Sequence, residues 1–352
     1  MSHASGVIRF AVLTVGFGFL LGCGDTRVST SRPDRDVIVI RGAGSTFAAP
    51  LYRQWAEEYH ELHPNVLLEY DAVGSGEGQK RFMADAVDFG GSDAALSDEQ
   101  IASVKRGVQL VPVAAGTVVI AYNLAGVPNG LRLPRDVYVD IFLGKITSWD
   151  DARIQKANPK IDPPNVPITL VVRTESSGTT FAFTNHLSAI SKAWRDGPGV
   201  GTAVQWPTTH IGARGNEGVA AHVARIPGAI GYSEYGIAER AKLAMAQLEN
   251  KEGTFVMPTA DSGHATLLSA ELPANLRAFF PDPDGKQSYP IVTYTWLLLY
   301  QQYADAQKAK AIKDFVKWGL TQGQRCNEPL GYVRVPPAVE AKALAAMQRI
   351  GN

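Results

Sequence analysis

The sequence predicts an α/β fold in which mixed, mostly parallel sheets are flanked by helices. The first observation is that short β-branched apolar runs alternate with amphipathic helical patterns, which is typical of βαβ units. The second is the length, because 352 residues favour two domains and can bury a large core. The third is the composition, 45% hydrophobic and 19% charged, which excludes a disordered chain.

Individual elements follow from the spacing of apolar residues. A helix is expected over 47–62, where apolar residues recur every three or four positions until His63-Pro64 ends the pattern. Ser97 is the expected N-cap of a short helix, and another helix is expected over 309–320. Strands are expected at 36–41, 66–70, 87–89, 118–122, 168–172 and 291–300.

The first 22 residues are expected to be a signal peptide. Arg9 precedes an apolar run of signal-peptide length that ends in Leu-Gly-Cys, which resembles a bacterial lipobox with Cys23 as the lipidated residue. The alternative is a buried apolar helix that ends in Gly-Cys. Residues 23–36 are polar and are expected to be a tether. Cys326 is then the remaining thiol, so neither an internal disulfide nor a cysteine-based zinc site is expected.

The charge balance limits the kinds of partner. With 34 basic and 34 acidic side chains, the chain lacks the overall positive charge of a nucleic-acid binder. The same balance argues against a broadly basic surface that captures anions. Any anion site must therefore be made locally.

Three turns share a pattern that can make such a site. At 42–47, 74–78 and 176–180, a turn rich in Gly, Ser and Thr leads into a helix. The first turn of a helix has free N–H groups and a positive dipole end, and hydroxyls add further donors. Together these features indicate an anion site, although each turn alone could be an ordinary N-cap.

Two charged residues add to this interpretation. Arg173 ends the 168–172 strand, where an α/β fold binds ligands, and its planar fork suits an oxyanion. Glu175 could form an ion pair with Arg173. The alternative interpretation is that Arg173 is an ordinary surface arginine. Asp93 could be a helix N-cap, but Ser97 and Asp98 fill that role better. An ionised carboxylate accepts a hydrogen bond from hydrogen phosphate, whereas sulfate has no proton to donate, so Asp93 would select between them.

Several longer segments carry a family resemblance. GAGSTFAAPLYRQWAEEY, VDFGGSDAALSD, VVRTESSGTTFAFT and GNEGVAAHVARIPGAIGYSEY are similar to the phosphate-binding lipoproteins of bacterial high-affinity phosphate ABC transporters. The resemblance covers nearly all of residues 37–340. It implies a two-lobed periplasmic-binding-protein fold of type II-like architecture with a two-segment hinge near 116–122 and 292–296. Together with the strand pattern, it implies one lobe from 37–117 and 294–352, and another from 118–293.

The resemblance also implies a phosphate site. Glu175 stands where the family has an aspartate that supports the arginine, and Glu77 replaces a small residue in the second turn and is expected to face solvent. No metal or cofactor is expected. The implied phosphate-binding residues are Thr46, Phe47 (through its backbone), Ser75, Asp93, Arg173, Ser177, Gly178 and Thr179.

The expected function is binding without chemistry. The chain would be an exported monomer, periplasmic or anchored at the outer face of a membrane, that delivers inorganic phosphate to an ABC permease. One alternative is a phosphatase on the same scaffold, although none of the seven histidines lies in the three turns. Another is a phosphate sensor or surface adhesin without a transport role.

Overall fold

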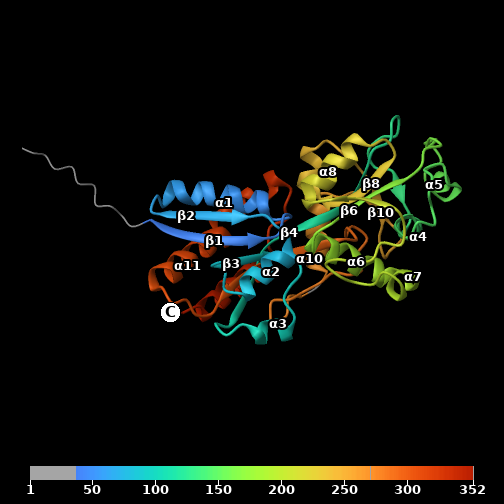
Figure 1. Cartoon of the computed structure of the whole chain (residues 1–352). Coiled ribbons are helices and arrows are strands. Elements are labelled where there is room, and N and C mark those ends of the chain that lie inside the picture. The colour runs from blue at the N-terminus through green and yellow to red at the C-terminus, as the bar shows by residue number, and fades with distance from the viewer. Residues whose placement is uncertain (1–36, 270, 352) are drawn as a thin grey trace, which may run out of the picture. The chain divides into compact units, whose positions relative to one another are not determined.

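A single long strand, β4 (Val108–Tyr122), runs through the middle of the fold and belongs to both halves of its sheet. Figure 1 shows the first strands of the chain on one side of β4 and strands β6 and β8 on the other. This computed structural model describes residues 37–269 and 271–351. The expected signal peptide, the expected lipidation site Cys23 and the expected tether all lie outside the described residues.

The first half of the sheet combines parallel and antiparallel pairs. Its order is β2-β1-β3-β12-β4, with β1 parallel to β2 and β3, and β12 antiparallel to β3 and β4. Because β1 and β3 run parallel, the turns that follow them emerge at the same edge of the sheet. The strands are β1 (Ile38–Gly44), β2 (Val66–Asp71), β3 (Phe89–Ser92) and β12 (Val292–Tyr300).

The second half continues from the C-terminal part of β4. Its order is β4-β8-β6-β7, with β6 parallel to both of its neighbours, and β9 also pairs with β4. A small separate sheet has the order β11-β10-β5. The strands are β5 (Arg132–Leu133), β6 (Thr169–Arg173), β7 (His210–Ala213), β8 (Ala229–Glu234), β9 (Ala244–Met245), β10 (Gln247–Glu249) and β11 (Phe255–Val256).

Helices connect the strands and cover the sheet. They are α1 (Ala49–Leu62), α2 (Ser75–Met83), α3 (Asp98–Ser103), α4 (Arg135–Phe142), α5 (Ala152–Ala157), α6 (Gly178–Ile190), α7 (Lys192–Asp196), α8 (Gly215–Arg225), α9 (Tyr235–Arg240), α10 (Ala260–Leu268), α11 (Ala306–Leu320) and α12 (Pro337–Ala346). Short 3₁₀ turns lie at Gln322–Cys326, Glu328–Leu330 and Met347–Arg349.

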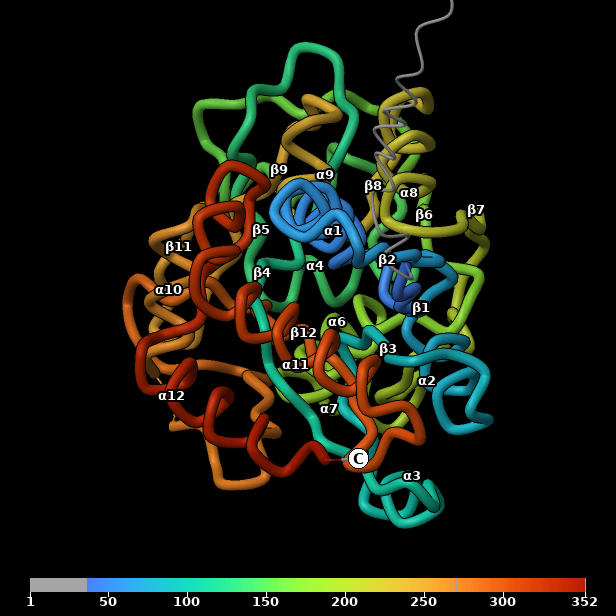
Figure 2. The backbone as a smooth tube through the Cα atoms, turned by 90° about the vertical axis from the view of Figure 1, so that its left-hand side faces the viewer, coloured from blue at the N-terminus to red at the C-terminus, as the bar shows by residue number. Residues whose placement is uncertain are grey.

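The two ends of the folded chain meet in the first half. Figure 2 shows the C-terminal helices on the side of the molecule that carries α1. Trp55 of α1 packs edge-on against Phe315 of α11, with 6.2 Å between ring centroids, and its indole N–H donates to the Gly323 carbonyl at 2.9 Å. Burying an apolar side chain of this size contributes about 1.5–3 kcal/mol. This contact therefore stabilises the half of the fold that is built from both ends of the chain.

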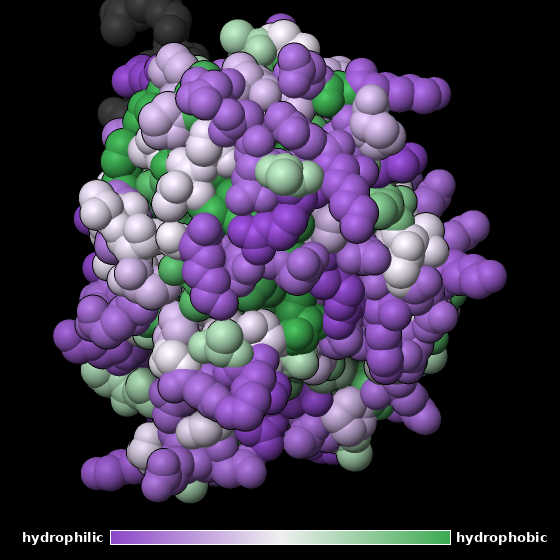
Figure 3. Space-filling model, turned by 90° about the vertical axis from the view of Figure 1, so that its right-hand side faces the viewer, coloured by the Kyte–Doolittle hydropathy of each residue, from purple (hydrophilic) through white to green (hydrophobic). Residues whose placement is uncertain are grey.

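The opposite side of the molecule presents a largely hydrophilic surface to solvent. Figure 3 looks at the right-hand side of Figure 1, and hydrophilic side chains cover most of the face that it shows. In the part of the chain that the structure describes, no helix is both long and apolar enough to cross a membrane.

The predicted α/β class and mixed sheet are confirmed, with adjustments in the elements. The strand expected at 87–89 spans Phe89–Ser92, and the strand expected at 118–122 begins at Val108. Pro112 is tolerated inside β4 because it lies opposite Trp296, where the register shifts at a β-bulge. Leu62, expected on the apolar stripe of α1, is exposed at the helix end.

The lobe boundaries remain a prediction. Within β4, the residues up to Thr117 pair with β12, whereas the residues from Val118 onward pair with β8. The change of partner coincides with the expected boundary after residue 117.

Candidate anion-binding site

The turns after β1, β2, β3 and β6 meet where the two halves of the sheet join. The Gly76 N–H, in the first turn of α2, donates to the Ser176 carbonyl at 3.0 Å, across 100 positions of sequence. The Arg173 guanidinium, at the end of β6, donates to the Thr46 hydroxyl at 2.9 Å. Gly178 lies against both Ser75 and Asp93. The three turns identified in the sequence therefore form one cluster.

Arg173 is the buried cation of this cluster, and its side chain is 1% exposed. Besides its bond to Thr46, it donates from Nη1 to the Thr179 hydroxyl at 3.2 Å. Its Nε–H donates to Glu175 Oε1 at 2.9 Å, and its Nη2 also contacts that oxygen. A guanidinium has five N–H groups, so the bonds to these three side chains leave one Nη1 hydrogen for another acceptor.

Glu175 fixes the arginine despite being one methylene longer than aspartate. The same Oε1 also accepts the Gly215 N–H at 2.9 Å, which ties the carboxylate to the start of α8. Burial alone would raise the pKa of Glu175, but the hydrogen bonds and charge of Arg173 outweigh it, so the pKa lies below its ordinary value. Glu175 is therefore ionised and forms an ion pair with Arg173.

Asp93 brings a second carboxylate into the cluster, and its side chain is buried. Burial raises its pKa to about 6, against the lowering effect of hydrogen bonds from Ser45 and Ser75 and of the Arg173 charge. The Ser45 hydroxyl donates to both carboxylate oxygens, at 2.7 and 2.8 Å, and the Ser75 hydroxyl lies 3.3 Å from Oδ2. These bonds hold the Asp93 carboxylate in place as a hydrogen-bond acceptor beside the donors of the cluster.

Two helices point their first turns at the cluster. Gly74, at φ 98°, is the N-cap of α2, and Ser177 is the N-cap of α6, where its hydroxyl accepts the Thr180 N–H at 3.1 Å. The positive end of each helix dipole therefore faces the cluster. Backbone N–H groups at such ends bind anions without adding net charge.

The structure brings the eight predicted ligand residues together and adds two that the sequence analysis missed. Ser45 lies in the first turn, where its position beside Thr46 was the available signal. Asn216 is fully buried at the start of α8 and contacts Thr46 and Thr179. Its Gly215-Asn216 turn after β7 repeats the strand–turn–helix pattern and could have been found in the same way.

Glu77 and Ser97 make structural contacts outside the cluster. Glu77 points away from the cluster and pairs with Arg81 at 2.9 Å. Ser97, not Asp93, caps α3, where its hydroxyl accepts the Gln100 N–H. Among the described residues, no group of three or more His, Cys, Asp or Glu side chains is placed to hold a metal ion.

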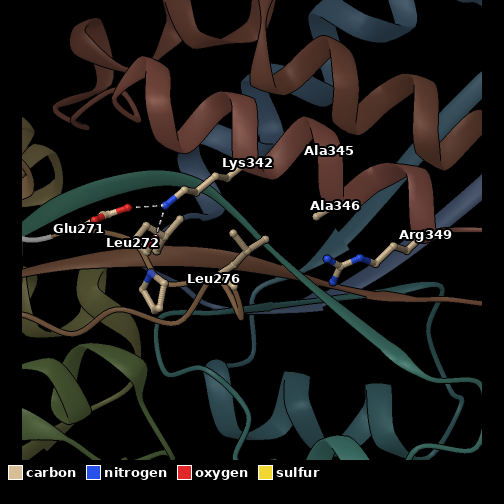
Figure 4. A pocket seen from close by; sticks show the side chains of 9 residues that line it. Glu271, Leu272, Leu276, Lys342, Ala345, Ala346 and Arg349 are labelled. Carbon is tan, nitrogen blue, oxygen red and sulfur yellow. Dashed lines mark hydrogen bonds and ion pairs between the residues drawn. The ribbon is translucent and has the colours of Figure 1, made fainter.

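A groove elsewhere on the molecule contains none of the predicted ligand residues. It has a volume of about 630 Å³ and lies between the 271–276 segment and α12 (Figure 4). Lys342 reaches across it and donates to Glu271 at 3.1 Å and to the Leu272 carbonyl at 2.6 Å. The groove is therefore separate from the Arg173 cluster.

The fold and the buried cluster define a two-lobed solute-binding protein of the periplasmic type, with a site built for an oxyanion. A model of the PBP superfamily domain matches residues 25–322. The phosphate-binding protein PstS of Methanocaldococcus jannaschii is 38% identical, and the match covers 94% of this chain and 90% of the relative. PstS of Xylella fastidiosa is also 38% identical, over 89% of this chain and 86% of the relative.

The chain belongs to the PstS family of phosphate-binding proteins. The fold agrees with a solved phosphate-binding protein from Stenotrophomonas maltophilia, at a TM-score of 0.71 and 23% identity. That likeness covers 88% of this chain and 94% of the solved one.

Proposed function

We propose that this protein binds inorganic phosphate between its two lobes and delivers it to the membrane permease of an ABC transporter. The observation that carries the proposal is that a buried cation, Arg173, and a buried carboxylate, Asp93, lie in one cluster of hydrogen-bond donors. The curated relatives are named as phosphate-binding proteins, which supports the same ligand.

The ligand chemistry follows from the numbers of donors and acceptors. Arg173, two threonine hydroxyls and the first turns of α2 and α6 offer hydrogen bonds to an oxyanion. Asp93 has a pKa near 6, so it is mainly ionised at neutral pH and can only accept. Hydrogen phosphate can satisfy both requirements, whereas sulfate would meet Asp93 with an unmade bond and charge repulsion.

The remaining proposals concern where the protein works. Residues 1–22 act as a signal peptide, lipid on Cys23 holds the mature chain at a membrane surface, and residues 23–36 give it reach. The protein functions there as a monomer, periplasmic or at the outer face of the membrane. The lobes are 37–117 with 294–352, and 118–293, and they close on phosphate around the segments near 116–122 and 292–296.

Calorimetric titration of the folded chain with phosphate, arsenate and sulfate tests the ligand. Phosphate and arsenate should bind, and sulfate should bind far more weakly. The Arg173→Ala variant should lose phosphate binding, while Arg41→Ala, at an exposed ion pair with Glu69, should keep it. Equal binding of sulfate and phosphate would overturn the proposed ligand.

The proposal also states that binding is not followed by chemistry. Incubation with a chromogenic phosphate ester should release no product above the buffer rate. Turnover that disappears in Arg173→Ala would instead establish a phosphatase that uses this site.

A further inference from the structure

We infer that Asn216 is a positioning residue that makes the Thr46 and Thr179 hydroxyls donate to the bound anion. Its side-chain Nδ2 lies 3.1 Å from Thr46 Oγ1 and 3.2 Å from Thr179 Oγ1. Asn216 itself is fully buried. The inference rests on the proposed function, because it concerns how that site recognises its oxyanion.

The orientation of the Asn216 amide is fixed by its other neighbour. The Glu234 N–H, at the end of β8, points at Asn216 Oδ1 from 3.1 Å. A backbone N–H can only donate, so the atom that faces it must be the amide oxygen. The NH₂ group therefore faces the two threonines, and each of its hydrogens has one hydroxyl as acceptor.

Each of these hydroxyls then receives two hydrogen bonds. Thr46 Oγ1 accepts from Arg173 at 2.9 Å and from Asn216, and Thr179 Oγ1 accepts from Arg173 at 3.2 Å and from Asn216. A hydroxyl has two lone pairs and one proton, so both lone pairs are occupied. Neither hydroxyl proton has an acceptor among the described residues, so each can be donated to an anion in the cluster.

The serine hydroxyls of the cluster provide a contrast. The Ser45 proton is already directed to Asp93, and the Ser75 hydroxyl lies between the Asp93 N–H and its carboxylate. A free threonine hydroxyl could rotate and offer a lone pair, which would repel an oxyanion. Asn216 fixes the orientation of both hydroxyls before the ligand binds. Such preorganisation lowers the free-energy cost of ordering the site on binding.

A double-mutant cycle in the full folded domain tests this role. Removing the Asn216 donors in Asn216→Ala should weaken phosphate binding by about tenfold or more. In a Thr46→Val/Thr179→Val background there is no hydroxyl to orient, so the same change should weaken binding little further. A purely structural role would give the same loss in both backgrounds, and that additivity would overturn the inference.

Asn158 provides a matched control. It is 4% exposed, its oxygen accepts one backbone N–H, and its NH₂ donates to two carbonyls, but these partners belong to β5 and α5. Asn158→Ala should therefore keep phosphate affinity. If Asn216→Ala does not fold, Asn216→Ser provides the same cycle with a smaller cavity.

The outcomes separate the two proposals. If the wild-type protein binds phosphate and Asn216→Ala binds it equally well, the inference is wrong and the proposed function stands. If the wild-type protein does not bind phosphate, the proposed function is wrong and the inference fails with it.

Discussion

Gly178 lies so close to Asp93 that no side chain fits between them. A Cβ atom at position 178 would lie 2.8 Å from Asp93 Oδ2 and 2.5 Å from Ser75 Oγ. The start of α6 must approach the turns after β2 and β3 to this distance for the cluster to form. The glycine is therefore required by the close approach of the two halves.

Gly178→Ala should accordingly weaken phosphate binding by about tenfold or more, because the added methyl does not fit at these distances and forces the turns apart. Thermal unfolding should change little, since each half can keep its own sheet. Gly218→Ala, in α8, is the control, because its Cβ would make only ordinary contacts at 3.7 Å with Ala213, the last residue of β7. Calorimetric titration of both variants checks the prediction, and unchanged affinity in Gly178→Ala would contradict the required approach.

Replacing Asp93 tests whether the site selects by proton count. Asp93→Asn turns one carboxylate oxygen into a donor, so sulfate no longer meets an unmade bond. The ratio of phosphate to sulfate affinity should fall by at least about tenfold in competition binding. Asp314→Asn, on the surface of α11, should leave the ratio unchanged. An unaltered ratio in Asp93→Asn would show that selectivity comes from elsewhere.

Glu234 should make the ligand-free protein less stable as the pH rises. Burial raises its pKa from an ordinary 4.5 to about 8, against the N–H groups of Gly236 and Ile237 and the charge of Arg240. A carboxyl with a raised folded-state pKa contributes stability that is fully present below the unfolded value and is lost as the pH rises through the folded value. The loss should fall between about pH 5 and pH 8 and amount to a few kcal/mol. Asp93 should also contribute a loss of stability as the pH rises to its pKa near 6.

Chemical denaturation at pH 5, 6, 7 and 8 measures this effect. The difference in free energy of unfolding between the wild type and Glu234→Gln should shrink as the pH rises. Glutamine cannot titrate, and its single side-chain oxygen can accept only one of the two N–H bonds. The free energy of unfolding of the variant should therefore be lower at pH 5 and fall less as the pH rises. Parallel pH profiles for the two proteins would contradict the assignment.

Cys326 should be almost inert as a thiol. It is buried, its Sγ donates to Glu58 Oε1 at 3.3 Å, and burial together with that carboxylate raises its pKa to about 11. Thiolate is the reactive form, and very little is present at pH 8. Ellman's reagent should therefore label a chain that starts after Cys23 slowly when it is folded and rapidly in denaturant. Rapid labelling of the folded chain would contradict this environment.

Much of the fold and the site was predictable because local patterns agree with tertiary structure. Arg173 closes a β-branched strand, and Ser177 precedes a helix, so both positions follow from short stretches of sequence. The start of β4 could not be predicted in this way, because proline normally interrupts a strand. Pro112 is accommodated only because it lies opposite a β-bulge. Asn216 follows the same strand–turn–helix pattern, but the partners that make it part of the site are 170 and 37 positions away. Such long-range contacts leave no periodicity in the sequence.

The position of β12 between β3 and β4 affects when the chain can fold. The Thr293 hydroxyl donates to the Asp93 carbonyl 200 positions away, and the edge of β3 that faces β12 has no neighbour until almost the whole chain has been synthesised. Contacts of such long sequence separation slow folding, because loop closure must precede them. A nascent chain of this topology stays incomplete until β12, Val292–Tyr300 of 352 residues, has left the ribosome. For the export proposed above, late completion means that the chain would cross the membrane before it acquires its final shape.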